Sequence, residues 1–279
     1  MQILMIGSDM IKTAANIVKG VLTRKRAYHS KFKQIRWVQE KLLKHQEDKQ
    51  VKKLAIDDLS IFYKRPYELL HSYREIFERE IYKFKSHPEA KVIIDCGSNI
   101  GLSVLYFNKL YPDAAVYAFE PDENNFTLLS RNIEHNKIKN VVVQQAAVWT
   151  QDGAISFNAN ESEASHISEV AFDSKVPCIR LKSFLQKFKS IDFLKIDIEG
   201  AEVPVVRDCA DCLGNVQNMF LEYHGKVDDT EKLAELLVIV KAAGFKTYIR
   251  NAADIINWPF VDKHSQTLYD VQLNLFCYR

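Results

Sequence analysis

The residues with the clearest chemical meaning lie in a short loop that follows a buried strand. Four of them share the spacing Asp-x-Gly-x-Asn-x-Gly: Asp95, Gly97, Asn99 and Gly101. The apolar run 92–94 precedes the loop and the apolar, periodic segment 102–110 follows it, an order that predicts a parallel strand, a tight loop and a helix. We expect the backbone of this loop, Ser98 included, to approach a ligand closely, because glycine lacks the side chain that would prevent it.

A carboxylate about twenty residues further along the chain points to a nucleoside. Glu120 follows the next apolar run, 115–119, where a doubly wound fold places the carboxylate that binds a pair of ribose hydroxyls. Pro121 is expected to border the same site. Gln145 and Ala146 leave the third predicted strand, and this position lies near the adenine in such folds.

The details of the loop favour one nucleoside over another. A dinucleotide loop has three glycines as GxGxxG, so that a pyrophosphate sits against the helix N-terminus, whereas this loop has only Gly97 and Gly101. Asp95 at the strand tip would repel a pyrophosphate, but its charge suits a ligand with an amino group and a sulfonium. We therefore predict S-adenosylmethionine as the cofactor, and an NAD-dependent oxidoreductase is the alternative.

A second stretch, 191–202, reads Ile-Asp-Phe-Leu-Lys-Ile-Asp-Ile-Glu-Gly-Ala-Glu and carries several charges in and after a predicted strand. Ligands bind outside the carboxyl ends of parallel strands, so this strand should open onto the same crevice as the glycine loop. Charges in a buried strand are costly unless they are paired. Lys195 is therefore expected to pair with Asp197 or with Glu222 of the next predicted strand, 219–223.

Three side chains are candidate catalytic groups that would act on the methyl acceptor: Asp197, Glu199 and His224. Methyl transfer from a sulfonium is an in-line displacement, and a base that takes the proton of an acceptor hydroxyl accelerates it. His224 is either that base or a bystander. Asp197 with Glu199 could instead hold a divalent cation, although we expect no resident metal.

These motifs together resemble the FkbM family of S-adenosylmethionine-dependent methyltransferases. The resemblance rests on Asp95 to Gly101, Ala118 to Pro121, Asn132 to Asn136, Asp192 to Glu202 and Leu221 to His224, and it covers residues 68–279. It implies an α/β, Rossmann-like, seven-stranded sheet that is mostly parallel with an antiparallel last strand. It also implies O-methylation of a hydroxyl on a sugar, glycan or other secondary metabolite.

Other functions remain open on the sequence alone. The domain could bind a nucleoside without turnover and dock to a membrane or partner. N-methylation or carboxyl methylation is a further alternative, because an amine or a carboxylate needs less help from a base.

The remaining pattern predicts the elements around the site. Helices are expected over 122–136, with Asp122 as the N-cap, and over 230–241, and the last strands over 245–250 and 271–278. Asp152-Gly153 lies between two short apolar runs, 147–150 and 154–157, which predicts a small β-hairpin insertion. The long connection 251–270 is either a surface wrap or an acceptor-binding loop.

The N-terminal region differs from the rest in charge. Between Lys12 and Lys53 the chain has thirteen Lys or Arg residues against three acids, with apolar residues at helical spacing. We predict amphipathic basic helices whose charged face is solvated, lies on anionic lipid or binds nucleic acid; without a nucleic-acid module, we expect no nucleic-acid partner. The helical stripe 67–84 should pack on the catalytic domain or form its lid, and we place the domains at 1–86 and 87–279.

Composition bears on the cell compartment in which the protein is expected. The formal net charge is +2, and no apolar run reaches the roughly eighteen residues of a membrane span. The five cysteines form no recognisable disulfide framework, and Cys209 with Cys212 is expected to be a reduced structural pair. We therefore predict a cytoplasmic protein, with peripheral contact at the inner membrane face as an option for the basic region.

Overall fold

The computed structural model describes residues 30–48, 50–85, 91–158, 166–167, 175–262 and 267–279. Its centre is a seven-stranded sheet in the order β12 (Lys246–Asn251), β13 (Val271–Tyr278), β11 (Val216–Gly225), β10 (Ile191–Ile196), β3 (Val92–Cys96), β4 (Ala115–Phe119) and β5 (Val141–Gln144). The five strands from β11 to β5 pair in parallel, and β13 runs antiparallel to both of its neighbours. The predicted Rossmann-like sheet with an antiparallel last strand is confirmed.

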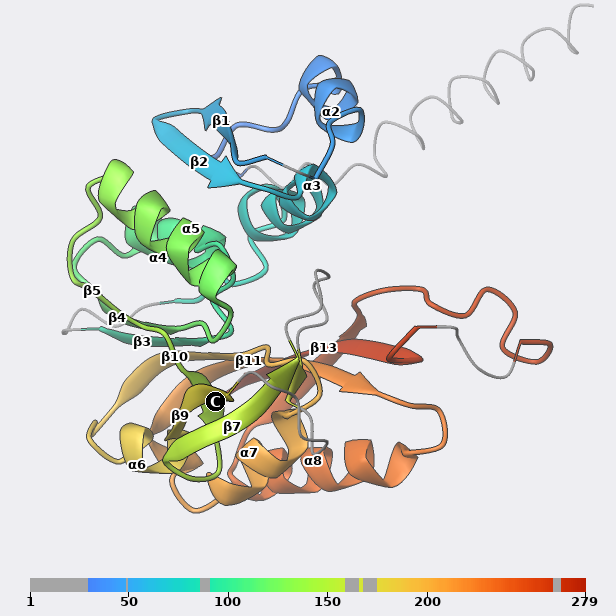
Figure 1. The fold of residues 1–279 in the computed structure, drawn as a ribbon. Helices are drawn as coiled ribbons and strands as arrows, with labels where there is room; N and C mark the ends of the chain where they lie inside the picture. Colours follow the sequence, from blue (N-terminus) through green and yellow to red (C-terminus); the bar gives the residue numbers. More distant parts are fainter. Residues whose placement is uncertain (1–29, 49, 86–90, 159–165, 168–174, 263–266) are drawn as a thin grey trace, which may run out of the picture.

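Helices cover both faces of this sheet (Figure 1). One face carries α4 (Leu102–Leu110) and α5 (Glu123–His135), and the other carries α6 (Leu181–Leu185), α7 (Glu202–Asp208) and α8 (Thr230–Ala242). Asp122 caps α5 as predicted, because its carboxylate accepts the backbone N–H of Asn125. The short helix η2 (Leu213–Asn215) leads into β11.

The alternation of side chains along the central strands explains the two cores. Ile93 and Phe193 belong to the apolar cluster on the α4 side, whereas the next residues, Ile94 and Leu194, belong to the cluster on the α7 side. Both faces of the central strands are thus buried. This is why the predicted strands read as continuous apolar runs.

The described part of the N-terminal region is only partly helical. It contains α2 (Trp37–Lys44), the antiparallel hairpin of β1 (Lys52–Ile56) and β2 (Leu59–Tyr63), α3 (Pro66–Tyr73) and the π-helix η1 (Arg74–Glu78). The prediction of amphipathic helices is therefore wrong for 30–36, 45–48 and 50–53. Ile35 donates its backbone N–H to the Glu78 carboxylate instead of to a helical carbonyl, and Asp57 turns the hairpin with φ +53°.

This region packs onto the α4 side of the sheet, as predicted for 67–84. Phe77, which is fully buried, contacts the rings of Phe32, Tyr73 and Tyr106, so that α4 and the N-terminal segment share one apolar core. The predicted boundary at residue 86 lies outside the described residues and stays a prediction. The predicted basic helix before residue 30 also lies outside them, and the membrane contact assigned to it stays a prediction.

The insertion after β5 differs from the predicted hairpin. It is a small sheet in the order β6 (Ala147–Trp149), β9 (Lys175–Arg180), β7 (Gly153–Asn158) and β8 (His166–Ile167). The two runs that flank Asp152-Gly153 do not pair with each other, because β9 lies between them and pairs with β6 in parallel and with β7 antiparallel. Asp152 stabilises this arrangement by accepting the backbone N–H of Arg180.

Two expectations from composition can be compared with the structure. All five cysteines are buried and free, which confirms the absence of a disulfide framework. Within the described ranges, no helix is both long enough and apolar enough to span a bilayer.

Asn132 of α5 joins the N-terminal hairpin to the loop after β3 and provides a test of this packing. Its fully buried amide accepts the N–H of Phe62 (2.6 Å) and donates to the carbonyls of Phe62 (3.0 Å) and Ile100 (2.8 Å). Asn132→Ala leaves these buried backbone groups without partners, so we expect the free energy of unfolding to fall by about 2–4 kcal/mol in urea titration. Asn108→Ala is the matched control, because Asn108 makes one long, exposed hydrogen bond (3.4 Å), and it should change the value by less than about 0.5 kcal/mol. Equal losses in both variants would contradict the joining role of Asn132.

Candidate functional site

The loop between β3 and α4 has the backbone that its glycines predict. Gly97 and Gly101 adopt φ of +82° and +88°, and Asn99 between them adopts +48°. A Cβ atom on Gly97 would lie 1.8 Å from the backbone oxygen of Asp197, so the loop packs directly against the end of β10. Ser98 donates its hydroxyl to the carbonyl of Asp95 (3.0 Å) and closes the turn.

Glu120 lies under this loop at the end of β4. Its carboxylate accepts the backbone N–H of Asn99 in the loop (2.7 Å) and that of Asp122, which follows Pro121 (3.0 Å). Burial raises the pKa of Glu120 to about 7, although these two hydrogen bonds oppose the rise. The backbone of Ala146 lies near that of Glu120, because the carbonyl of Gln144 accepts the N–H of both residues.

A buried ammonium ion lies beneath the loop. Lys195 Nζ donates to the carbonyl of Gly97 (2.7 Å) and lies 3.3 Å from Asp95 and 3.2 Å from Asp197. Asp95 also accepts the hydroxyl of Ser103 at 2.5 Å. The expected partner Asp197 is confirmed, and Asp95 is a second partner that the sequence pattern did not identify.

His224 occupies the centre of an acidic cluster at the ends of β10 and β11. Its Nδ1 lies 3.0 Å from Glu202 Oε1, and its Nε2 lies 3.5 Å from Glu199 and 3.7 Å from Glu222. Both His224 and Glu202 are buried. Glu202 also accepts the backbone N–H of Gly200 (3.0 Å), so it is well placed to orient the imidazole.

The charges in this cluster shift one another's protonation. Burial alone would lower the pKa of His224, but the carboxylates of Glu202, Glu199 and Glu222 raise it well above 6.5. Burial raises the pKa of Glu222 to about 8 and that of Glu199 well above 4.5, while His224 opposes both shifts. Such shifted carboxylates in a pocket are typical of functional sites.

A pocket of about 960 Å³ joins the loop to this cluster. Six predicted site residues line it: Gly97, Ser98, Asn99, Asp197, Glu199 and His224. The other predicted residues are not in its lining: Asp95, Gly101, Glu120, Pro121 and Ala146. Asp95 and Glu120 instead support the lining from below, through Lys195 and through the amides of Asn99 and Asp122.

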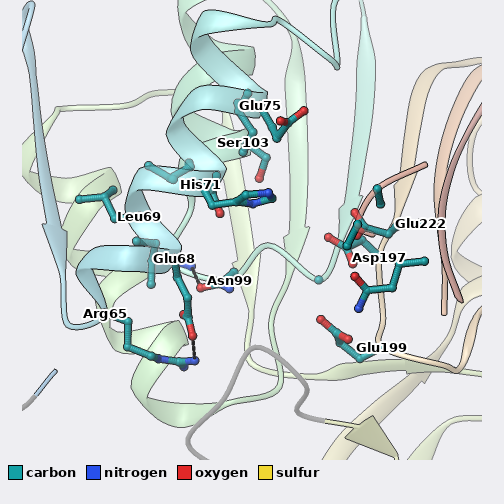
Figure 2. A pocket seen from close by; sticks show the side chains of 18 of the residues that line it. Arg65, Glu68, Leu69, His71, Glu75, Asn99, Ser103, Asp197, Glu199 and Glu222 are labelled. Atoms are coloured by element: carbon teal, nitrogen blue, oxygen red, sulfur yellow. Dashed lines mark hydrogen bonds and ion pairs between the residues drawn. The ribbon is translucent and has the colours of Figure 1, made fainter. Parts of the chain in front are cut away.

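The opposite wall of the pocket comes from the N-terminal segment. Figure 2 shows Arg65, Glu68, His71 and Glu75 on this wall, facing Asp197, Glu199 and Glu222 across the space. The prediction from the sequence concerned only the inward apolar stripe of this segment. A second face at the same helical spacing (68, 71, 75, 79 and 82) could have indicated a lining role.

Two further elements complete the lining. Gln272 and Asn274 of β13 lie in register with His224 and Glu222 of β11. The connection 251–270 supplies Tyr269, whose hydroxyl donates to the carbonyl of Glu199 (2.5 Å) and whose ring lies 5.1 Å from that of His224. Trp258 and Phe260 of this connection are exposed and do not line the pocket.

Fold and site together define an α/β protein of the doubly wound class, with its pocket at the carboxyl ends of the parallel strands. The family model of the methyltransferase FkbM domain matches residues 95–247, which is more than half of the chain. The chain belongs to this family.

Curated relatives are similar to about half of the chain. Methyltransferase 1 of Beauveria bassiana is 27% identical over 185 residues, covering 56% of this chain and 74% of its own. The 2-O-methyltransferase NoeI of Sinorhizobium fredii is 25% identical, covering 52% and 68%. The hexuronic acid methyltransferase AglP of Haloferax volcanii is 28% identical, covering 52% and 62%.

The buried cation can be tested against an exposed one. Lys195→Met leaves the buried Asp95 and the half-buried Asp197 without their counter-ion, so we expect the free energy of unfolding to fall by about 3–5 kcal/mol. Lys182→Met, which breaks an exposed pair with Asp211, should cost less than about 1 kcal/mol. Adding Asp95→Asn to Lys195→Met should recover part of the loss, because it removes one of the uncompensated charges. Equal losses for the two lysine variants would contradict a structural role for the buried cation.

Proposed function

We propose that this protein transfers a methyl group from S-adenosylmethionine to a hydroxyl of a sugar or glycan. The observation that carries the proposal is a single pocket that joins a glycine loop, supported by a carboxylate at the end of β4, to a cluster of carboxylates around His224. The first part suits a nucleoside, and the second suits an acceptor that must lose a proton.

The residues present fit a cationic nucleoside. The cofactor would lie along Gly97, Ser98 and Asn99, with its ribose near the Glu120 carboxylate between Asn99 and Asp122. Beneath this position one ammonium group, that of Lys195, is shared by two carboxylates, those of Asp95 and Asp197. A sulfonium and an ammonium group are favoured in such a field, whereas a pyrophosphate is not. When bound, the cofactor supplies a methyl group, whose bond to sulfur breaks as the acceptor oxygen forms its bond to carbon.

The acceptor is proposed to lie against Asp197, Glu199 and His224. Their side chains approach one another at the carboxyl ends of β10 and β11, beside the loop. An acceptor bound there would have its hydroxyl in line with the methyl group. The carboxylates are the nearest groups that can accept the hydroxyl proton. His224, oriented by Glu202, would hold the acceptor oxygen or the carboxylate next to it.

The names of two relatives support the two parts of this proposal, an oxygen as the methyl acceptor and a sugar as the molecule that carries it. One is a 2-O-methyltransferase and another is a hexuronic acid methyltransferase. The polar wall formed by Glu68, His71 and Glu75 supports the same class, because sugar hydroxyls need donors and acceptors on more than one side. Lys64 and Arg65 on this wall would also suit an acceptor that carries a carboxylate.

The acceptor class can be tested directly. The purified protein is incubated with S-adenosylmethionine and one of three acceptors: a hexuronic acid glycoside, its carboxyl-reduced hexose analogue, or an aminosugar. We expect methylation of the first two, detected by mass spectrometry, and the added methyl group should survive mild alkali because it is an ether. Loss of the methyl group in alkali would indicate carboxyl methylation, and labelling of the amine alone would indicate N-methylation. Cofactor binding without methylation of any acceptor would instead support a non-catalytic nucleoside-binding module.

The ribose assignment predicts a dependence on pH. Only the ionised form of Glu120 accepts two hydrogen bonds from ribose hydroxyls while it also holds the amides of Asn99 and Asp122. Its pKa is raised to about 7, so binding is complete above this pH and is lost as the pH falls and the carboxylate takes up a proton. We expect the affinity for S-adenosylhomocysteine, measured by calorimetry, to be about tenfold weaker at pH 6 than at pH 8.

Two variants control this experiment. Glu120→Gln should bind more weakly at pH 8 and show no such dependence, because its amide does not titrate. Glu123→Ala removes an exposed carboxylate nearby and should behave as the unmodified protein. A Glu120→Gln variant with unchanged affinity would refute the ribose assignment.

A further inference from the structure

We propose that Asp197, Glu199 and His224 form a site for one divalent cation, such as Mn²⁺ or Mg²⁺. One ligand atom from each side chain lies within 4.8 Å of the others. Ions of this kind bind their ligands at about 2.0–2.6 Å, so atoms that share one ion lie up to about 5 Å apart. Two carboxylates and one imidazole are donors that such ions accept, and three protein ligands leave positions open for a substrate.

The orientation of His224 favours a metal ligand over a surface contact. The side chain is almost fully buried, and its Nδ1 faces Glu202 at 3.0 Å. Glu202 in turn accepts the backbone N–H groups of Gly200 and Ile198. In protein metal sites a carboxylate on one ring nitrogen fixes the histidine so that the other nitrogen binds the ion. Here the other nitrogen, Nε2, points toward Glu199 and Glu222 without a hydrogen bond among the described residues.

An unpartnered amide oxygen beside the cluster is an independent sign of a ligand. Asn274 is 6% exposed and lines the pocket, yet its Oδ1 has no hydrogen-bond partner among the described residues. It lies on β13 in direct register with Glu222, on the strand next to His224. Buried polar atoms are normally paired, so this oxygen is expected to meet an ion, its bound water or an acceptor hydroxyl.

The excess of negative charge at this end of the sheet also favours a bound cation. Asp197, Glu199, Glu202 and Glu222 gather within one cluster, and Lys195 is already shared by Asp95 and Asp197. A divalent cation would offset this excess of negative charge. Its role in the reaction rests on the proposed function: Asp197, Glu199 and His224 would then hold the ion instead of contacting the acceptor directly, and the ion would bind the acceptor hydroxyl and make its proton easier to remove.

Metal binding can be measured without cofactor or acceptor, so its outcome is independent of the methyl-transfer proposal. The full-length protein is treated with chelator, desalted and titrated with MnCl₂ in 0.3 M NaCl, and free Mn²⁺ is followed by electron paramagnetic resonance. We expect one equivalent to bind, because salt screens diffuse attraction far more than direct coordination. Glu199→Gln and Asp197→Asn should each weaken binding by at least tenfold while the thermal unfolding transition is retained.

Two further variants separate coordination from nearby charge. Glu202→Gln should weaken binding about 10- to 100-fold, as expected for a group that orients a ligand. Glu235→Gln removes an exposed carboxylate paired with Arg207 and should leave binding unchanged. The proposal is overturned if no Mn²⁺ binds at millimolar concentration, or if Glu199→Gln and Asp197→Asn bind as tightly as the unmodified protein.

Discussion

The site depends on one buried ammonium group. Lys195 lies on β10, contacts carboxylates at the ends of β3 and β10, and donates to the carbonyl of Gly97 in the loop between them. An unpaired carboxylate at this depth would be strongly unfavourable, so the lysine allows the strand ends to remain acidic. Because Gly97 has no side chain, the loop approaches the backbone of Asp197 directly. The part of the pocket suited to a cofactor and the part suited to an acceptor are therefore held as one unit.

A simple periodicity places the remaining polar groups. On the α4 face of the sheet, apolar residues such as Phe193 and Phe220 come first along β10 and β11, and ionisable residues follow at every second position. The antiparallel strand β13 follows the same rule in the opposite direction, since Phe276 pairs with Phe220 and Asn274 pairs with Glu222. The apolar core and the polar pocket thus lie on the same face of the sheet, at opposite ends of the strands. The polar half lies at the carboxyl ends, where doubly wound folds bind their ligands.

The walls that face the acceptor come largely from outside the part of the chain that matches the family model. That match covers residues 95–247, which includes the glycine loop and the acidic cluster. The opposite wall, α3 and η1, precedes it, and β13 with the connection before it follows it. The residues proposed to bind the cofactor and the acceptor hydroxyl thus lie mostly within the match to the family. The choice of acceptor is expected to depend on the segments outside that match, which are held in place by contacts such as that of Asn132 with Phe62.

The sequence by itself determined the order of strands and helices, the glycine loop, Glu120 and the acidic motif after β10, because these depend on local spacing and on apolar runs. Only the tertiary structure decided which groups meet. Asp95 joins Lys195, Glu202 orients His224, and β9 separates β6 from β7, through contacts between residues distant in the chain. The N-terminal hairpin was missed because a basic, amphipathic sequence suits a helix and an alternating strand almost equally over short lengths. Packing against α5 then selects the strand, since burial on one face outweighs weak local preference.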